Sequence, residues 1–174
     1  VLEDGSIDQS EYTRCIELAK NNIADEEYAF LLSDFGDFLM NEKIYDEVED
    51  VYNKSLSIYR KLNQESGDEY TEDIYWILRR LSNYHMISNE YANADKILNE
   101  INDIIKDSND SLKKGETLYL LAHLHFNQLN HEKAEDELNS ALNLLTGIDN
   151  EKGRDKLSEC LYLMGLLHKT TGKL

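Results

Sequence analysis

One pattern of large and small residues recurs along the chain and restricts the folds that it can adopt. The pattern has a large residue, a second large residue three positions on, a small residue next to it, and a further large residue three positions later. Its four copies are Leu32, Phe35, Gly36, Leu39; Leu78, Leu81, Ser82, His85; Leu118, Leu121, Ala122, His125; and Leu161, Met164, Gly165, His168. Successive copies are displaced by 46, 40 and 43 residues. Repeats of this length are typical of folds whose similar units stack, because one unit cannot bury its apolar face alone.

The first three copies each continue into a second apolar segment with spacings of three and four. These segments hold Tyr45, Val48, Tyr52, Ser55; Tyr91, Ala94, Leu98, Ile101; and His131, Ala134, Leu138, Ala141. Spacings of three and four predict helices, so each unit reads as a pair of helices. Two helices that cross closely need small residues at the contact. We assign this role to Gly36, Ser82, Ala122 and Gly165 on the first helices and to Val48, Ala94 and Ala134 on the second.

Helical periodicity extends over nearly the whole chain. The 174 residues include no proline, although average composition would give roughly 9, and no alternating pattern typical of strands occurs. The predicted helices cover residues 6–21, 27–41, 44–62, 70–88, 91–107, 114–128, 131–146 and 154–170. The connections between them are short and polar, so neighbouring helices should run antiparallel. The sequence predicts an all-α fold.

Two segments resemble the tetratricopeptide repeat (TPR) family: LLSDFGDFLMNEKIYDEVEDVYNKSLSIYRKL and LHFNQLNHEKAEDELNSALNLL. The unit length of 40 to 46 residues exceeds the usual 34, which is similar to the kinesin-light-chain-like long-repeat branch. The proline that often closes the second helix of this family is absent from every unit. The resemblance implies a right-handed TPR-like solenoid of antiparallel helix hairpins.

The repeat pattern also predicts how the chain is organised. We expect one TPR-like domain over residues 1–174, which is a fragment of a longer protein. It would comprise a divergent half-unit at 6–27, repeats at 28–66, 74–112 and 114–150, and the first helix of a further repeat at 154–174.

Charge and composition disfavour several classes of function. The chain has 35 acidic and 18 basic residues, a net charge of −17, which is unfavourable for binding nucleic-acid phosphates or anionic membranes. Its longest apolar cluster, 161–167, is too short to span a membrane. Cys15 and Cys160 form no disulfide framework, so we expect an intracellular, cytoplasmic protein and leave a nuclear location open.

The resemblance implies that first helices line a concave face, where a partner would bind. Positions off the core stripe of these helices should be polar, yet several are large and amphipathic, as in peptide-binding hot spots. The predicted apolar anchors are Met40, Trp76, Met86, Tyr119 and Phe126. The predicted polar contacts are Arg79, Arg80, Asn83, His123 and Asn127. In the alternative interpretation, Trp76 and Phe126 fill the space between helices, and the two arginines pair with nearby acids.

Metal binding and catalysis find little support in the sequence. His85, His125 and His168 occupy equivalent positions, but helices packed about 8–10 Å apart cannot bring such a ladder onto one zinc ion. We expect these histidines to form hydrogen bonds within the core. There is no HExxH motif, phosphate loop or glycine-rich dinucleotide turn, so we expect no enzyme activity and no cofactor.

The favoured function is a non-catalytic scaffold that binds a peptide or helical segment of a protein partner in its concave groove. One alternative is a sensory or regulatory solenoid within a larger signalling or transcription regulator. Another is an acidic chaperone for basic clients, which would use acidic residues on the second helices. The oligomeric state is left open.

Overall fold

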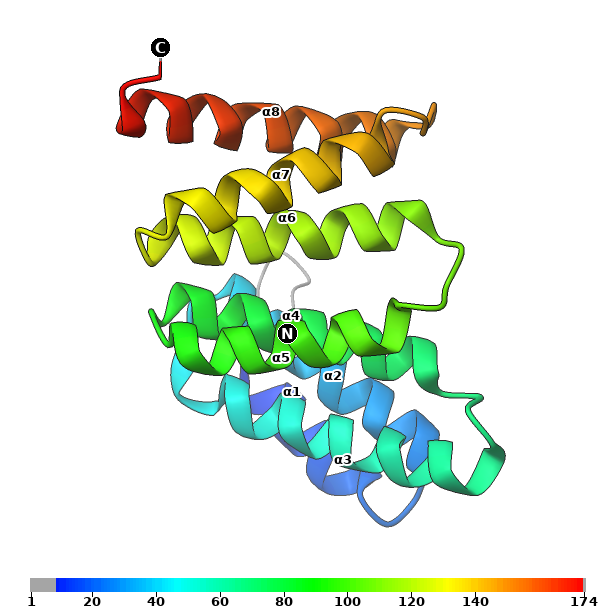
Figure 1. Cartoon of the computed structure of the whole chain (residues 1–174). Coiled ribbons are helices and arrows are strands. Elements are labelled where there is room, and N and C mark those ends of the chain that lie inside the picture. The colour runs from blue at the N-terminus through cyan, green and yellow to red at the C-terminus, as the bar shows by residue number, and fades with distance from the viewer. Residues whose placement is uncertain (1–8, 174) are drawn as a thin grey trace. The chain divides into compact units, whose positions relative to one another are not determined.

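The computed structural model describes residues 9–173 and contains only helices and their connections in that range (Figure 1). The helices are α1 (Gln9–Ala19), α2 (Asp25–Asn41), the 3-10 turn η1 (Tyr45–Glu47), α3 (Val48–Ser66), α4 (Thr71–Ile87), α5 (Tyr91–Ile105), α6 (Ser111–Asn127), α7 (His131–Leu145) and α8 (Glu151–Thr171). Each predicted helix is present, with ends that differ by no more than about four residues. Predicted helical residues 6–8 lie outside the described residues. The all-α prediction is confirmed.

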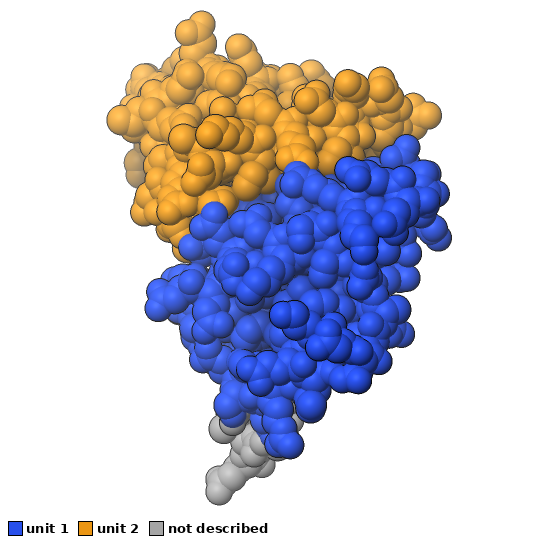
Figure 2. Space-filling model, turned by 90° about the horizontal axis from the view of Figure 1, so that it is seen from below, with its two compact units in different colours: residues 1–84 blue, residues 85–174 orange. Residues whose placement is uncertain are grey.

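The chain divides into two compact units, residues 1–84 and residues 85–174 (Figure 2). Unit 1 contains α1, α2, α3 and most of α4, and unit 2 contains the end of α4 and helices α5 to α8.

In unit 1, α2 and α3 form an antiparallel hairpin that depends on a close approach at Gly36. The ring of Tyr52 lies against Gly36, so that a Cβ atom at position 36 would overlap the ring. Further along, the hydroxyl of Ser55 donates to the carbonyl of Ala29 at 2.7 Å. Residues 36 and 29 of α2 therefore face residues 52 and 55 of α3, so the two helices run antiparallel. The predicted role of Gly36 as a small residue at a helix crossing is confirmed.

In unit 2, α6, α7 and α8 pack in sequence, and each helix runs antiparallel to the one before it (Figure 1). Gly115 of α6 lies against the side chain of Leu145 of α7, and His125 lies 2.7 Å from Glu137 at the opposite end of the same pair. Ala134, Leu138, Ala141 and Leu145 of α7 are fully buried with residues of α8. The periodicity did not single out Gly115, although its closeness to Leu145 makes it a second crossing residue.

Of the small residues assigned to crossings, Gly165 departs from the prediction. Ser82, Ala122, Val48, Ala94 and Ala134 have no exposed surface, whereas Gly165 is exposed and no atom lies near a Cβ built there. The reason is that α8 uses another face, with Cys160, Leu163 and Leu167 buried in the unit 2 core. No helix within residues 9–173 covers the face that carries Gly165.

The backbone repeats with the same period as the side chains. Lys43, Asn89, Leu129 and Gly172 all have positive φ, between 59° and 70°. In each case the next backbone N–H donates to the carbonyl five residues before it, and these carbonyls belong to Leu39, His85, His125 and His168. This is the hydrogen bond of a Schellman motif, which ends a helix with one left-handed residue. The four helix ends therefore share one backbone geometry, and they are separated by 46, 40 and 43 residues, as the copies of the side-chain pattern are.

The two cysteines lie in unlike surroundings. Cys15 on α1 is exposed and Cys160 on α8 is buried. Burial raises the pKa of the Cys160 thiol to about 11, which makes it an unreactive core residue. Within the described residues, no helix has both the length and the apolarity needed to cross a membrane.

The close approach at Gly36 predicts opposite effects for one substitution at two positions. Gly36→Ala should lower the free energy of unfolding by roughly 1–3 kcal/mol, because the methyl group overlaps the Tyr52 ring. Gly165→Ala should raise it by roughly 0.5–1 kcal/mol, because alanine is the better helix former and the space is open. Urea unfolding followed by circular dichroism measures both. Equal effects at the two positions would contradict the crossing assigned to Gly36.

The repeated helix end gives a second prediction for the same assay. Leu129→Gly should stabilise the protein by roughly 0.5–1 kcal/mol, because glycine adopts positive φ without the steric cost that leucine bears. The matched control, Leu161→Gly, also replaces an exposed leucine of unit 2 but lies within a helix. It should destabilise by about 1 kcal/mol.

Candidate partner-binding surface

Helices α2 and α4 of unit 1 lie side by side and parallel. The hydroxyl of Tyr70, just before α4, donates to Glu26 near the start of α2 at 3.2 Å, and Arg80 reaches Asp37 further along both helices. Between these links lies a cavity of about 380 Å³. Residues lining it include Phe30, Ser33, Tyr59, Asp73, Trp76 and Arg80, and we call this set the α2–α4 groove.

Trp76 lies at the surface of the groove. Its side chain is 38% exposed, and its indole N–H donates to Glu72 at 2.9 Å. The guanidinium of Arg79 lies 5.1 Å from the centre of its ring, a cation–π arrangement. Tyr75 supports the ring from the core side in an edge-on contact, with centroids 5.2 Å apart. The helix thus holds Trp76 in place while leaving part of it accessible.

Arg80 is part of a polar link among three helices. Its Nε donates to both oxygens of the Asp37 carboxylate, at 2.7 and 2.9 Å. The hydroxyl of Tyr52 donates to the same carboxylate at 2.7 Å. Burial and the adjacent Asp37 charge raise the pKa of Tyr52, so it remains a proton donor. The alternative in which an arginine pairs with a nearby acid is therefore correct for Arg80.

Asp73 is the second charged residue that lines the groove. Partial burial is the main cause that raises its pKa above the ordinary aspartate value, and the carboxylates of Glu26 and Glu72 act in the same direction. The sequence did not single out Asp73, because acids are so frequent in this chain that one more in a first helical turn carries no signal. Phe30 and Ser33, by contrast, lie off the core stripe of α2, as Trp76 does on α4.

Two other predicted contact residues of unit 1 lie outside this lining. Met40 is half-buried near the end of α2, and Asn83 is exposed on α4. Their part in binding remains a prediction.

In unit 2 the predicted residues are more enclosed than expected. Met86 is only 9% exposed, so it offers little surface to a partner. Tyr119 and Phe126 are partly buried and pack against the core shared by α6, α7 and α8. The ammonium of Lys156 lies 4.7 Å from the centre of the Tyr119 ring.

The polar residues predicted on α6 are also partly enclosed. His123 stacks on Tyr119 with centroids 6.2 Å apart, and burial lowers its pKa. Asn127 is half-buried at the end of α6. Side chains of unit 2 thus already occupy much of this surface.

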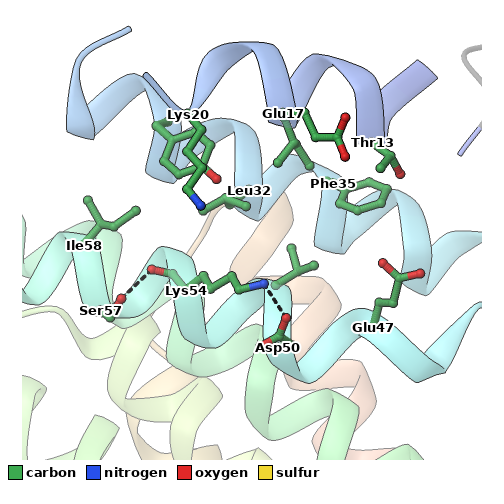
Figure 3. Close-up of a pocket in the computed structure, with 13 residues that line it drawn as sticks. Thr13, Glu17, Lys20, Leu32, Phe35, Glu47, Asp50, Lys54, Ser57 and Ile58 are labelled. Atoms are coloured by element: carbon green, nitrogen blue, oxygen red, sulfur yellow. Dashed lines mark hydrogen bonds and ion pairs between the residues drawn. The ribbon is translucent and has the colours of Figure 1, made fainter. Parts of the chain in front are cut away.

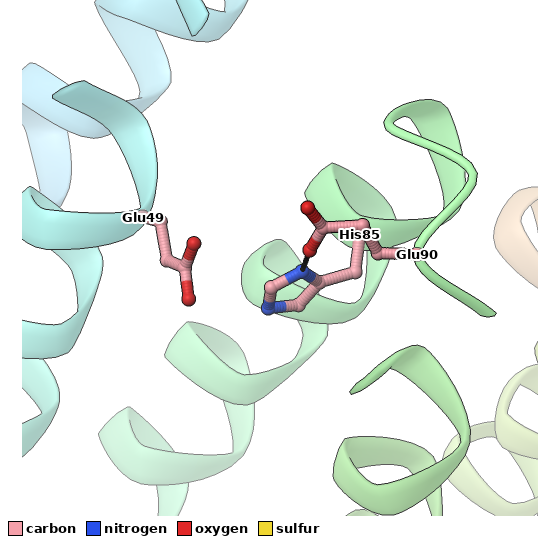
Figure 4. Close-up of side chains that lie close together, drawn as sticks. All are labelled: Glu49, His85 and Glu90. Atoms are coloured by element: carbon pink, nitrogen blue, oxygen red, sulfur yellow. Dashed lines mark hydrogen bonds and ion pairs between the residues drawn. The ribbon is translucent and has the colours of Figure 1, made fainter. Parts of the chain in front are cut away.

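The three histidines at equivalent positions each pair with a carboxylate inside unit 2. His85 Nδ1 lies 2.7 Å from Glu90 (Figure 4), and His168 lies 3.4 Å from Glu135. His125 lies 2.7 Å from Glu137 through Nδ1, while Lys133 lies 2.9 Å from its Nε2. Because a lysine ammonium can only donate, this network assigns the proton of His125 to Nδ1. The expectation of hydrogen bonds within the core is confirmed for His85 and His125, which are buried. His168 also pairs with a carboxylate but is half-buried, so it does not belong to the core.

A second cavity in unit 1, of about 400 Å³, lies among α1, α2 and α3 (Figure 3). Leu32, Phe35 and Val51 supply apolar surface to it. Lys54, on its lining, is held by Asp50 at 2.5 Å. Sequence periodicity did not predict this cavity, since it depends on how α1 packs against the hairpin.

No family model and no curated protein sequence matches the chain. Among solved structures, it is similar to BtubC (BKLC) from P. vanneervenii, with a TM-score of 0.77 and 15% sequence identity. The match covers 94% of this chain and 65% of that chain, so this chain spans less than two thirds of the BtubC length. At this identity the similarity shows the fold alone, which is a helical-repeat fold.

The link among Asp37, Tyr52 and Arg80 predicts a measurable loss of stability on removal of one hydroxyl. Tyr52→Phe should lower the free energy of unfolding by roughly 1–2 kcal/mol, because the ring is buried and its O–H donates to a carboxylate. The matched control, Tyr162→Phe, removes the hydroxyl of a side chain that is 71% exposed. It should change stability by less than about 0.5 kcal/mol. Urea unfolding compares the two, and a Tyr52→Phe value as small as the control would show that the hydrogen bond contributes nothing.

Proposed function

We propose that this chain is a non-catalytic interaction module that binds a peptide or helical segment of a protein partner through the α2–α4 groove. In this proposal the repeats at 28–66, 74–112 and 114–150 belong to one right-handed TPR-like solenoid, with 6–27 as a divergent half-unit and 154–174 as the start of a further repeat. The similarity to a helical-repeat protein supports this organisation.

The observation that carries the proposal is the exposure of two large aromatic side chains beside a cavity. Phe30 is 64% exposed and Trp76 is 38% exposed, and both line the groove. Aromatic side chains at the edge of a cavity are typical of interface hot spots, because covering them removes a large apolar area from water. Both lie on regular helices that neighbouring side chains hold in place, so little ordering is needed on binding.

Of the predicted contact residues, Trp76, Arg79 and Arg80 have the strongest support. Trp76 and Arg80 line the groove, and Arg79 packs on the Trp76 ring. Met40 and Asn83 could extend the contact along the same unit. The unit 2 residues Met86, Tyr119, His123, Phe126 and Asn127 form a secondary candidate surface, because neighbouring side chains already cover them in part.

Selection from a library of displayed random peptides, with the purified protein as target, tests the proposal. Peptides enriched by the wild-type protein should bind Trp76→Ala at least about tenfold more weakly, a change of ~1.4 kcal/mol that is ordinary for a tryptophan hot spot. Isothermal titration calorimetry measures both affinities, and circular dichroism melting shows whether the variant is folded.

Tyr162→Ala is the matched control, because it removes an exposed aromatic ring from α8 of unit 2. It should bind the selected peptides as the wild type does. If folded Trp76→Ala retains full affinity for every selected peptide, or if no peptide is enriched, the α2–α4 groove is not the binding site.

A further inference from the structure

We propose that the α2–α4 groove accepts the cationic side chain of a lysine or arginine residue of the partner, with Asp73 and Ser33 as its acceptors. This inference rests on the proposed function and specifies the chemistry of the bound segment.

The charge of the groove favours a cation. Asp73 lines the cavity, and the charged groups that act on its carboxyl are Glu26 and Glu72, which have the same sign. A partly desolvated carboxylate beside like charges gains most from a positive group within hydrogen-bonding distance. A carboxylate of a partner would instead add a further negative charge to this site.

Arg80 does not cancel this preference, although it lines the same cavity. Its Nε donates to both oxygens of Asp37, so its charge already has a carboxylate partner. Exchange of that partner for an incoming acid would break the Arg80–Asp37 ion pair and leave Asp37 without a cationic partner.

Ser33 provides an independent indication that a polar ligand is accommodated. Its side chain lines the cavity and the residue is only 6% exposed. Among residues 9–173, its hydroxyl has no hydrogen-bond partner. The hydroxyl therefore has free acceptor capacity toward the cavity, and an N–H donor that enters the groove would bond to this oxygen as well as to Asp73.

The walls suit the remainder of a lysine or arginine side chain. Phe30, Tyr59 and Trp76 line the cavity and supply aromatic surface against which the aliphatic part of such a side chain can pack. Arg79, which is outside the lining, already places its guanidinium 5.1 Å from the Trp76 ring. The Trp76 ring therefore already takes part in a cation–π contact in this structure.

The single tryptophan of the sequence makes the test specific. In ¹H–¹⁵N spectra of the whole chain, the one indole N–H signal reports on Trp76. The probes are n-butylammonium and n-butylguanidinium, which mimic the two side chains, and neutral n-butanol, all at constant ionic strength. Both cations should shift the indole signal saturably, and butanol at the same concentration should shift it far less.

Asp73→Asn should weaken binding of both cations at least about tenfold, and Ser33→Ala should weaken it severalfold. Asp103→Asn, which removes an exposed carboxylate of α5 in unit 2, is the matched control and should have no effect. No saturable cation shift, or equal affinities for wild type and Asp73→Asn, would overturn the inference.

The peptide selection separates this inference from the proposed function. Selected peptides should contain a lysine or arginine whose change to norleucine weakens binding to the wild type but not to Asp73→Asn. Peptides that need Trp76 yet contain no essential basic residue would overturn the cation site and leave the proposed function intact. If no peptide depends on Trp76, the proposed function itself fails.

Discussion

The carboxylate of Asp37 is the interaction on which the arrangement of unit 1 depends. It accepts the hydroxyl of Tyr52 from α3 and the Nε of Arg80 from α4, and so joins three helices. The link requires the close approach next to it, because the Tyr52 ring reaches Asp37 only by lying against Gly36. A larger residue at position 36 would displace the ring and its hydroxyl together. Packing and hydrogen bonding thus reinforce each other at one point.

Unit 2 keeps the same apolar pattern but connects its helices with different polar groups. The position equivalent to Asp37 is His123, which stacks on Tyr119 instead of joining an ion pair. The equivalent histidines also choose different partners: His125 pairs with Glu137 of α7, and His168 pairs with Glu135 of the same helix. The repeat therefore preserves small and large residues at the helix crossings, while its polar contacts are particular to each unit.

This difference explains what the sequence can predict and what it cannot. Spacings of three and four residues reflect local helix geometry, so a single sequence is enough to predict the helices. The equivalent helix ends at Lys43, Asn89 and Leu129 follow the same repeat. Gly165 shows the limit, because whether a small residue is buried depends on a helix that packs against it. The groove shows the same limit, because its contacts join residues that are distant in sequence. Arg80 bonds to Asp37, and Trp76 lines one cavity with Phe30, in each case across more than forty residues.

The chemistry of the groove depends more on which side chains pair with one another than on which residue types the sequence contains. Read from the sequence, Arg79 and Arg80 suggest a surface for carboxylates or phosphates. In the structure, Asp37 compensates Arg80 and the Trp76 ring carries Arg79, whereas Asp73 faces the cavity with like charges beside it. Asp73 is therefore a charged acceptor at this surface whose charged neighbours, Glu26 and Glu72, have the same sign. A scaffold can thus present an acceptor site on a helix that carries two adjacent arginines, since the charge that a partner meets is the one left uncompensated after folding.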